Sequence, residues 1–272
     1  MPILEFLTMA HRFFVPGEQR AEKVKQLFTT VAPRYDLIND LQGFGLHRYW
    51  KRLVIQLARV QQGDRVPDVC CGTGDLALAL ARRGAQTIGL DFNEEMLRIA
   101  ESKVPRAEGG SQEPGVRSQE SGVRSQKTEA RRERAALIEF IRGDAEALRF
   151  ADNSFDIVTV GYGLRNLTSW EIGLREMQRV AKPGGRLLAL EFGKPDNPLW
   201  RALYFSYLRL FVPLLGRVFC GNAGAYAYIL ESLKHYPGQE GVAGKMRELG
   251  LIDVRVINLH GGVMSINFAA KP

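Results

Sequence analysis

The sequence of 272 residues is poor in cysteine: it has three, of which Cys70 and Cys71 are adjacent. Adjacent cysteines do not have the spacing of zinc ligands, and an odd number argues against a framework of disulfides. We therefore expect no metal site and a cytoplasmic, reducing location. No apolar stretch of about 20 residues is present, so no transmembrane helix is expected. The N-terminal residues also lack the basic segment and apolar core of a signal peptide.

Two common nucleotide-binding patterns are missing from the glycine-rich turn Gly72-Thr73-Gly74. The turn lacks the G-x-G-x-x-G pattern of nicotinamide and flavin sites, which disfavours an NAD-dependent or nucleotide-sugar oxidoreductase. It also lacks the G-x-x-x-x-G-K-[ST] pattern, which disfavours a nucleoside triphosphate as the ligand. A titration with the candidate cofactors would discriminate between these classes.

The charge is unbalanced toward basic residues, with 37 Lys and Arg against 30 Asp and Glu and a formal net charge of +7. Such a balance favours contact with an anionic surface, either a membrane leaflet or nucleic acid. No nucleic-acid-binding motif is present, so we expect no nucleic acid as a partner. A peripheral contact with the inner face of the cell membrane is the preferred prediction, and solubility alone is the alternative explanation.

A strand–turn–helix pattern is present at Asp68-Val69-Cys70-Cys71-Gly72-Thr73-Gly74-Asp75, which is followed by a run of helix formers. Gly72 and Gly74 allow a tight turn and a close approach of the backbone to a ligand. Asp91 follows Gly72 by about twenty residues, the spacing at which a second strand places a carboxylate beside a ribose. The pattern predicts a ligand that contains a nucleoside; the alternative is a tight turn that binds nothing.

Strand-like and helix-like segments alternate along the chain. The alternation predicts an α/β fold with a doubly wound, mostly parallel, seven-stranded sheet and a C-terminal antiparallel hairpin, which is a Rossmann-like architecture. The predicted strands are 65–69, 86–90, 137–142, 155–160, 186–191, 254–259 and 264–268, and the predicted helices are 18–30, 50–60, 75–83, 94–103, 170–180, 226–235 and 239–249. Pro67 is unusual in a central strand because proline lacks an N–H donor, but we expect this strand to form.

Ligands of such sheets bind at the carboxyl ends of the strands. That edge is predicted to carry the segment 68–75, Asp91, Asp144, the segment 161–166 and Glu191. An acid directly after the third strand can reach an adenine amino group, while a neighbouring backbone N–H meets a ring nitrogen. The polar candidates are therefore predicted to gather at one edge of the sheet.

Three segments stand apart from the alternation of strands and helices. Residues 1–60 are predicted to form an N-terminal helical cap on the domain 61–272. Residues 105–135 contain a polar seven-residue repeat with few aromatic residues, which predicts a disordered surface insertion. Residues 196–236 are aromatic and basic, and Pro213 is expected to kink them. This last segment predicts an amphipathic helix at a membrane surface or at an apolar pocket; the alternative is a helix packed in the core.

Two levels of resemblance to known proteins follow from these motifs. The pattern D-x-x-C-G-T-G-D at Asp68–Asp75 resembles the first motif of class I S-adenosylmethionine-dependent methyltransferases. Further stretches are similar to the ubiquinone/menaquinone biosynthesis C-methyltransferase family. They are Ala32-Pro33-Arg34-Tyr35-Asp36, His47-Arg48-Tyr49-Trp50-Lys51, Gly163-Leu164-Arg165-Asn166 and Tyr228 to Pro237. The resemblance covers most of the chain outside the repeats.

The resemblance implies methyl transfer from S-adenosylmethionine to a ring carbon of a polyprenylated quinol, with demethylmenaquinol to menaquinol as the preferred conversion. The residues expected to bind the cofactor are Asp68, Gly72, Thr73, Gly74, Asp91, Asp144, Ala145 and Gly161. A sulfonium methyl group is already activated, so the enzyme mainly has to align it with the ring carbon. That carbon becomes a nucleophile when the neighbouring hydroxyl loses its proton.

The expected catalytic residues are Arg165, Asn166 and Tyr35, with Asp36, His47 and Tyr162 as secondary candidates. Arg165 and Asn166 would orient and stabilise the ring oxygen, because arginine is a poor base at neutral pH. A packed structural histidine explains His47 at least as well. Three alternatives stay open: a naphthoquinol or a benzoquinol ring, a monomer or a homodimer, and an enzyme or a non-catalytic cofactor-binding accessory protein of a quinone-synthesis complex.

Overall fold

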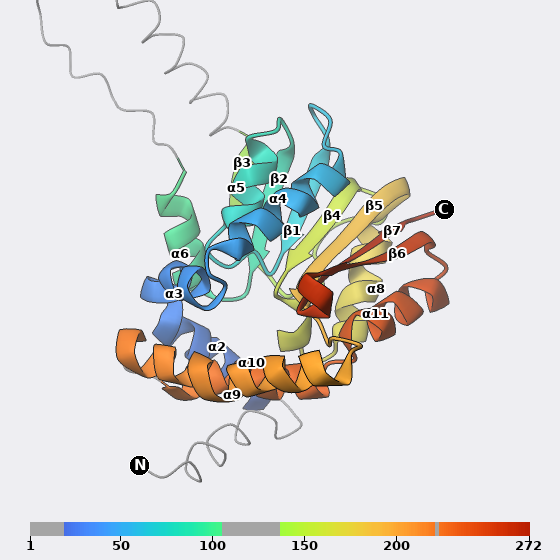
Figure 1. Cartoon of the computed structure of the whole chain (residues 1–272). Helices are drawn as coiled ribbons and strands as arrows, with labels where there is room; N and C mark the ends of the chain where they lie inside the picture. The colour runs from blue at the N-terminus through green and yellow to red at the C-terminus, as the bar shows by residue number, and fades with distance from the viewer. Residues whose placement is uncertain (1–18, 105–136, 221–222) are drawn as a thin grey trace, which may run out of the picture.

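The computed structural model describes residues 19–104, 137–220 and 223–272 (Figure 1). Within these residues a seven-stranded sheet has the order β3-β2-β1-β4-β5-β7-β6. The strands are β1 (Arg65–Val69), β2 (Gln86–Asp91), β3 (Ile138–Arg142), β4 (Phe155–Gly161), β5 (Ala181–Phe192), β6 (Ile252–Leu259) and β7 (Met264–Ala270). β1 to β5 pair in parallel, whereas β7 is antiparallel to both β5 and β6. The predicted fold class is confirmed.

Helices flank the sheet and also cover one of its edges. They are α2 (Gln19–Val31), α3 (Tyr35–Gln42), α4 (Leu46–Ala58), α5 (Asp75–Ala81), α6 (Glu94–Ser102), α8 (Trp170–Val180), α9 (Pro198–Cys220), α10 (Ala223–His235) and α11 (Gly238–Glu248). The short 3-10 turns η1 (Ala32–Arg34), η2 (Leu164–Asn166) and η3 (His260–Gly262) complete the chain. In Figure 1, α2, α3, α9 and α10 lie together beyond one edge of the sheet, and we call them the helical layer. This is the edge at which β5 ends, because the chain passes from β5 into α9.

Local sequence explains where several helices begin. The side chain of Asn93 caps α6, since its Oδ1 accepts hydrogen bonds from the N–H groups of Glu95 at 3.0 Å and Met96 at 3.3 Å. Ser169 caps α8 in the same way, because its hydroxyl accepts from the N–H of Ile172 at 3.3 Å. Both helices therefore begin where the sequence predicted.

Pro67 lies inside β1, and the strand forms as expected. It pairs with Ile88 of β2, whereas the ladder to β4 covers only Asp68 and Val69. The hydroxyl of Thr159 in β4 donates to the carbonyl oxygen of Pro67 at 3.5 Å. Because the carbonyl and the nitrogen of one strand residue point to the same side, the proline nitrogen also faces β4. The missing donor therefore falls where the ladder to β4 has not yet begun.

Several boundaries differ from the prediction, and the two largest differences are at the starts of α4 and β5. α4 begins at Leu46 instead of residue 50, directly after Gly45, whose φ of +72° ends the preceding turn. β5 begins at Ala181 instead of residue 186. The segment that was expected to be a loop is held extended, because Gly184 N donates to the carbonyl of Lys271 and Lys271 N donates to the carbonyl of Gly185, both at 2.9 Å. The chain end after β7 supplies these partners.

α9 continues as one helix through Pro213. In the part of the chain that the structure describes, no helix combines the length and the apolar character needed to cross a bilayer. The predicted insertion at 105–135 and the first residues of the predicted cap, 1–18, lie outside the described residues. The division into a cap, a domain and two insertions stays a prediction.

Candidate active site

The glycine turn after β1 and the acid at the end of β2 form one unit. Gly72 has a φ of +55°, and a Cβ placed on it would meet no atom within 4 Å, so its backbone faces open space. Asp91 Oδ2 accepts a hydrogen bond from Gly72 N at 2.8 Å, and Oδ1 accepts one from Asn93 N at 2.9 Å. Burial raises the pKa of Asp91. The two bonds fix a carboxyl group that still has lone pairs for a ligand.

An open groove of about 660 Å³ extends from Asp91 along the ends of β2 and β3. Its walls include Cys70, Asp91, Phe92, Asp144, Ala145 and Asn166. The N–H of Glu146 orients Asp144 by donating to its Oδ1 at 2.8 Å. The volume is typical of a small-molecule site. Asp91 beside Gly72 suits the ribose of a nucleoside, and Asp144 with the backbone of Ala145 suits the base.

Three residues that were expected to bind the cofactor, Asp68, Thr73 and Gly74, do not line the groove. A Cβ on Gly74 would be 2.7 Å from an aromatic side chain of β3, so this glycine allows α5 to pack closely. The hydroxyl of Thr73 donates to Asp36 Oδ1 at 2.6 Å. Asp68 is buried, accepts a hydrogen bond from Thr159 Oγ1 at 2.8 Å, and has a pKa that burial raises to about 7. The described walls of the groove include none of the three, and their contact with a cofactor stays a prediction.

Asp36 of α3 joins the helical layer to the glycine turn. Besides Thr73, it accepts a hydrogen bond from Lys103 Nζ at 2.5 Å. The same ammonium group donates to Asp75 Oδ1 at 2.8 Å, and Lys51 of α4 donates to Asp75 Oδ2 at 2.8 Å. Burial alone would raise the pKa of Asp75, but the two lysines lower it to about 2. The ionised carboxylate thus connects α3 and α4 to the start of α5.

Arg165 and Asn166 follow β4 in η2 and hold the backbone of Tyr162. Arg165 Nη1 and Asn166 Nδ2 each donate to the carbonyl of Tyr162 at 2.9 Å. Arg165 Nη1 also forms a buried ion pair with Glu191 Oε1 at the end of β5. Asn166 Oδ1 accepts a hydrogen bond from the hydroxyl of Tyr228 at 3.2 Å. Bonds from three elements therefore fix the two side chains.

Tyr35 and Tyr162 separate two small cavities beside the groove. The outer cavity, of about 50 Å³, has walls that include Gly72, Asp91, Gly161, Asn166, Tyr35 and Tyr162. The inner cavity, of about 40 Å³, has walls that include Tyr35, Tyr162, Arg165 and Phe192. The groove and the outer cavity share Asp91 and Asn166. The three expected catalytic residues therefore line neighbouring spaces, and Gly161 lines the outer cavity.

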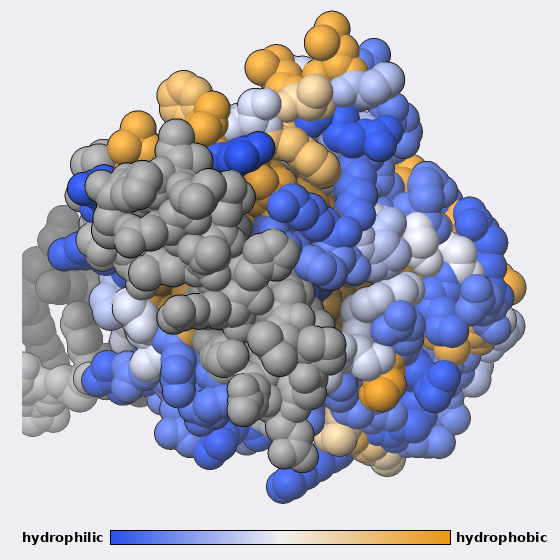
Figure 2. All heavy atoms as spheres, turned by 90° about the horizontal axis from the view of Figure 1, so that it is seen from below, coloured by the Kyte–Doolittle hydropathy of each residue, from blue (hydrophilic) through white to orange (hydrophobic). Residues whose placement is uncertain are grey.

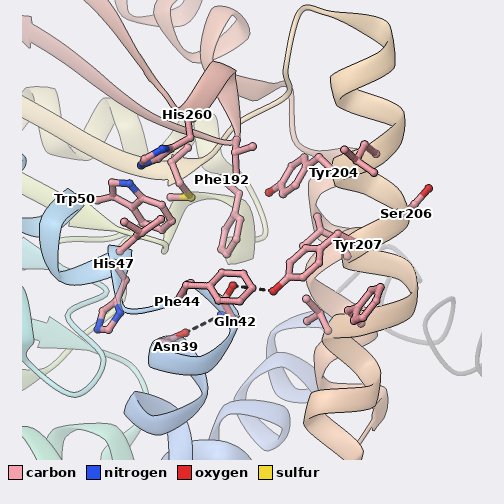
Figure 3. A pocket seen from close by; sticks show the side chains of 18 of the residues that line it. Asn39, Gln42, Phe44, His47, Trp50, Phe192, Tyr204, Ser206, Tyr207 and His260 are labelled. Atoms are coloured by element: carbon pink, nitrogen blue, oxygen red, sulfur yellow. Dashed lines mark hydrogen bonds between the residues drawn. The ribbon is translucent and has the colours of Figure 1, made fainter.

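The inner cavity borders an apolar slot of about 500 Å³ between α3, α4 and α9 (Figure 3). Asn39, Gln42, Tyr162 and Phe192 line both spaces. The slot walls are rich in aromatic side chains, among them Trp50, Phe192, Tyr204 and Tyr207. The hydroxyl of Tyr207 donates to the carbonyl of Gln42 at 2.9 Å, which joins α9 to α3. The slot thus connects the surroundings of Arg165 to the surface at α9.

The electrostatics place a fixed cation beside neutral phenols. Burial alone would lower the pKa of Arg165, but Glu191 raises it, so the guanidinium is charged at neutral pH. Burial raises the pKa of Tyr35 and of Tyr162, so both phenols keep their protons. Burial and then Lys51 lower the pKa of His47. These groups can stabilise an anionic oxygen, but Tyr35 and Tyr162 cannot serve as bases at neutral pH.

Sequence reasoning assigned no role to Glu191, Lys51 or Lys103. Glu191 ends an apolar strand, which placed it at the correct edge, but its partner Arg165 is 26 residues away. The pair of Lys103 and Asp36 spans 67 residues. Neither pairing has a spacing signal, because each depends on how distant segments meet at the edge of the sheet.

Comparison with known proteins gives a family match over nearly all of the chain. The model of the ubiE/COQ5 methyltransferase family matches residues 17–118 and 115–271. A curated protein of Ectopseudomonas mendocina, "Ubiquinone/menaquinone biosynthesis C-methyltransferase UbiE", is 39% identical over 265 residues, which cover 95% of this chain and 92% of that protein. The protein of the same name from Azotobacter vinelandii is 38% identical over 261 residues, with 95% and 93% covered.

Solved structures with this fold are more distant in sequence. A protein of Thermotoga maritima described as "SAM-dependent methyltransferase, possible histamine N-methyltransferase" aligns with a TM-score of 0.59 at 17% identity, covering 92% of this chain and 100% of its own. Phosphoethanolamine N-methyltransferase 2 of Haemonchus contortus, in complex with S-adenosyl-L-methionine, aligns with a TM-score of 0.56 at 16% identity, covering 84% of this chain and 53% of its own. At such identities the likeness shows the fold alone, and it is that of Rossmann-like methyltransferases.

Proposed function

We propose a substrate and a mechanism from the premise that this chain belongs to the ubiE/COQ5 methyltransferase family. It is an S-adenosylmethionine-dependent C-methyltransferase of ubiquinone/menaquinone biosynthesis. Our proposal for the acceptor is a ring carbon of a polyprenyl quinol, with demethylmenaquinol to menaquinol as the preferred conversion. The observation that carries it is the series of neighbouring spaces from the groove at Asp91, past Tyr162, to the apolar slot.

The groove suits S-adenosylmethionine by its own residues. The fixed carboxyl group of Asp91 would accept hydrogen bonds from the ribose hydroxyls, and Asp144 with the N–H of Ala145 would meet the adenine. The open space at Gly72, which a Cβ would occupy, leaves room for the methionine part. When bound, the sulfonium supplies an activated methyl group.

The residues past β4 stabilise the acceptor oxygen. The charged guanidinium of Arg165 favours the phenolate form of the hydroxyl next to the acceptor carbon, which makes that carbon nucleophilic. Tyr35 lines both small cavities and Asn166 lines the outer one, and the two side chains orient the ring. Because burial keeps Tyr35 and Tyr162 protonated, we assign two proton transfers to water. The hydroxyl loses its proton before the methyl transfer, and the ring carbon loses its proton afterwards, which restores the aromatic ring. The non-catalytic alternative gains no support from the comparisons.

The apolar slot would hold the isoprenoid tail. Its mouth lies at α9, whose outer side exposes Leu199, Leu203, Leu210, Phe211 and Leu214 beside Arg201, Arg209 and Arg217. Figure 2 looks onto this side of the molecule and shows hydrophobic side chains projecting along its upper edge. An exposed apolar helix face with arginines is typical of contact with an anionic lipid surface. We therefore propose peripheral binding to the membrane through α9, so that the tail passes from the lipid into the slot.

Membrane binding is tested by sedimentation with vesicles. The intact protein should sediment with vesicles that contain phosphatidylglycerol, and the double variant Leu199→Glu/Leu214→Glu should stay in the supernatant. Methylation of a short-chain quinol in detergent-free buffer should persist in the variant, because these two exposed residues do not line the slot. Equal sedimentation of both proteins would contradict the proposed contact.

The function itself is tested with a methyl-labelled cofactor and a reduced short-chain demethylmenaquinol under anaerobic conditions. The expected result is a product that carries the label on a ring carbon. A parallel reaction with a benzoquinol of equal tail length decides which ring is preferred. Cofactor binding without transfer to either ring would overturn the proposal and support the accessory role.

A further inference from the structure

Besides His47 Nδ1, which lies 3.5 Å from Asp40 Oδ1, four buried polar atoms at the walls of the slot lack a hydrogen-bond partner. Among the described residues no partner is present for Gln42 Oε1, Trp50 Nε1, Tyr162 Oη or Tyr204 Oη. All four side chains line the slot. Buried polar atoms in native proteins are usually hydrogen-bonded, because an unsatisfied one keeps the full cost of its desolvation. Several such atoms around one apolar space point to a ligand that brings polar groups with it.

Two of these atoms belong to the end of the slot where the reaction takes place. Tyr162 lines the slot and both small cavities, including the one that reaches Arg165. Tyr204 projects from α9 into the slot (Figure 3), with 6% of its surface exposed. The charge of Arg165 acts on both phenols, and Tyr204 acts on Tyr162. Tyr162 therefore borders both the cavity at the guanidinium and the slot that Tyr204 lines.

We propose that the hydroxyl groups of Tyr162 and Tyr204 bind the second oxygen of the quinol ring, the one para to the oxygen at Arg165. This inference rests on the proposed function, because it assumes that a quinol ring occupies this end of the slot. A quinol carries two oxygens at opposite positions of the ring, and the apolar slot would otherwise bury the second one without a partner. A phenol can donate and accept, so the pair suits a hydroxyl in either role.

The two tyrosines would then determine specificity for a 1,4-diol. A site built to hydrogen-bond a hydroxyl discriminates strongly against an analogue that lacks it, because the polar groups of the site remain unpaired. Naphthoquinols and benzoquinols share this arrangement of oxygens, so the inference holds for either ring. It also gives Tyr162 a role on its side-chain oxygen, separate from the carbonyl that Arg165 and Asn166 hold.

The experiment compares two acceptors in three proteins. One acceptor is a short-chain 1,4-naphthalenediol, kept reduced, and the other is the matching naphthol that retains only the hydroxyl next to the acceptor carbon. Tyr162→Phe and Tyr204→Phe remove a single atom that has no partner within the described chain. Each should lower kcat/KM for the diol by about tenfold, the value of one neutral hydrogen bond, and change that for the naphthol by less than about twofold. An equal decrease for both acceptors would overturn the proposal.

Tyr207→Phe is the matched control. It removes a hydroxyl from the same slot and the same helix, but this hydroxyl already donates to the carbonyl of Gln42. Any effect of the control should be the same for diol and naphthol.

The S-adenosylhomocysteine affinity and the melting temperature of every variant separate misfolding from loss of recognition. The double variant Tyr162→Phe/Tyr204→Phe should prefer the diol only as far as the intrinsic reactivity of the two acceptors differs. A wild-type protein that binds cofactor but methylates neither acceptor would contradict the proposed function itself, whereas a diol preference that survives in the double variant contradicts only this inference.

Discussion

The groove along β2 and β3 and the slot beside α9 differ in how their polar atoms are satisfied. In the groove, the chain's own N–H groups bind Asp91 and Asp144 before any ligand arrives. In the slot, the hydroxyls of Tyr162 and Tyr204 have no partner among the described residues. The groove is therefore organised in advance, as a site for a common cofactor can be, whereas in our proposal the slot is completed by the molecule that enters it.

The two regions also differ in how the chain builds them. The acids of the groove come from the ends of neighbouring strands, whose register fixes their positions. The slot is assembled from α3, α4 and α9, which are distant in sequence. Substitutions in the groove should therefore affect cofactor affinity alone, and substitutions at the wall between the two regions should affect turnover alone.

Arg165→Ala should produce the largest effect and gives the clearest test of that separation. Loss of the cation that stabilises the ring oxygen should lower kcat by about 100- to 1,000-fold, with little change in S-adenosylhomocysteine affinity measured by calorimetry. The variant also leaves Glu191 buried without its partner, which costs about 3–5 kcal/mol of stability. Arg165→Gln/Glu191→Gln should regain much of that stability without regaining turnover. A parallel loss of cofactor affinity would assign Arg165 to the groove.

Asp91→Ala should weaken S-adenosylhomocysteine binding by about 100-fold or more, because it removes the acceptor of the ribose hydroxyls and frees the glycine turn. The affinity of the slot for a short-chain quinone, measured by the quenching of tryptophan fluorescence, should be unchanged. Asp91→Asn serves as the control. It keeps the size of the side chain but removes the charge and one of the two oxygens that accept hydrogen bonds from Gly72 N and Asn93 N. Unchanged cofactor affinity in Asp91→Ala would mean that the ribose lies elsewhere.

Asp68→Asn sharpens the comparison by its dependence on pH. The pKa of Asp68 is raised from 3.8 to about 7 in the fold, so the native state holds a proton that the unfolded chain releases. Its contribution to stability is therefore full below about pH 4 and is lost as the pH rises to about 7, by an amount on the order of a few kcal/mol. The difference in melting temperature between variant and wild type should grow from pH 5 to pH 8. A constant difference would contradict the raised pKa.

Lys103→Gln should have the smallest effect. It breaks the partly exposed bridge from Asp36 to Asp75, and such ion pairs contribute about 0.2–1 kcal/mol each. Cofactor affinity should fall by about two- to fivefold, and high salt should reduce the difference from wild type. Lys103→Arg, which keeps the charge, is the control. A loss as large as that of Asp91→Ala would make the bridge a direct part of the groove.

Much of the fold and of the groove could be predicted from the sequence because the signals are local. Strand, glycine turn and helix fix Gly72, and the spacing to Asp91 follows from the next strand. The start of β5 could not be predicted, since Gly184 and Gly185 read as a loop and their partners come from Lys271. The ion pair of Arg165 with Glu191 and the bridge at Lys103 likewise have no local pattern.

The slot was anticipated only as an alternative for the aromatic segment 196–236. Aromatic residues with arginines fit an interfacial helix, a pocket wall or a core helix equally well, since all three bury one side. The structure distinguishes them, because α9 places Tyr204 in the slot and leaves Leu199 and Leu214 exposed outside it. α9 therefore forms a wall of the slot, and its contact with a membrane stays the proposal made above.

Tyr162 lines the slot and both small cavities, and so lies between the proposed sites of the lipid tail and the cofactor. This position bears on the kinetics of the enzyme. In the proposed function the nucleoside lies along β2 and β3 and the lipid tail enters from α9, so neither molecule would block the route of the other. The spent donor can leave and a fresh one enter while the tail stays in place. Initial-rate studies should accordingly find no compulsory order of addition.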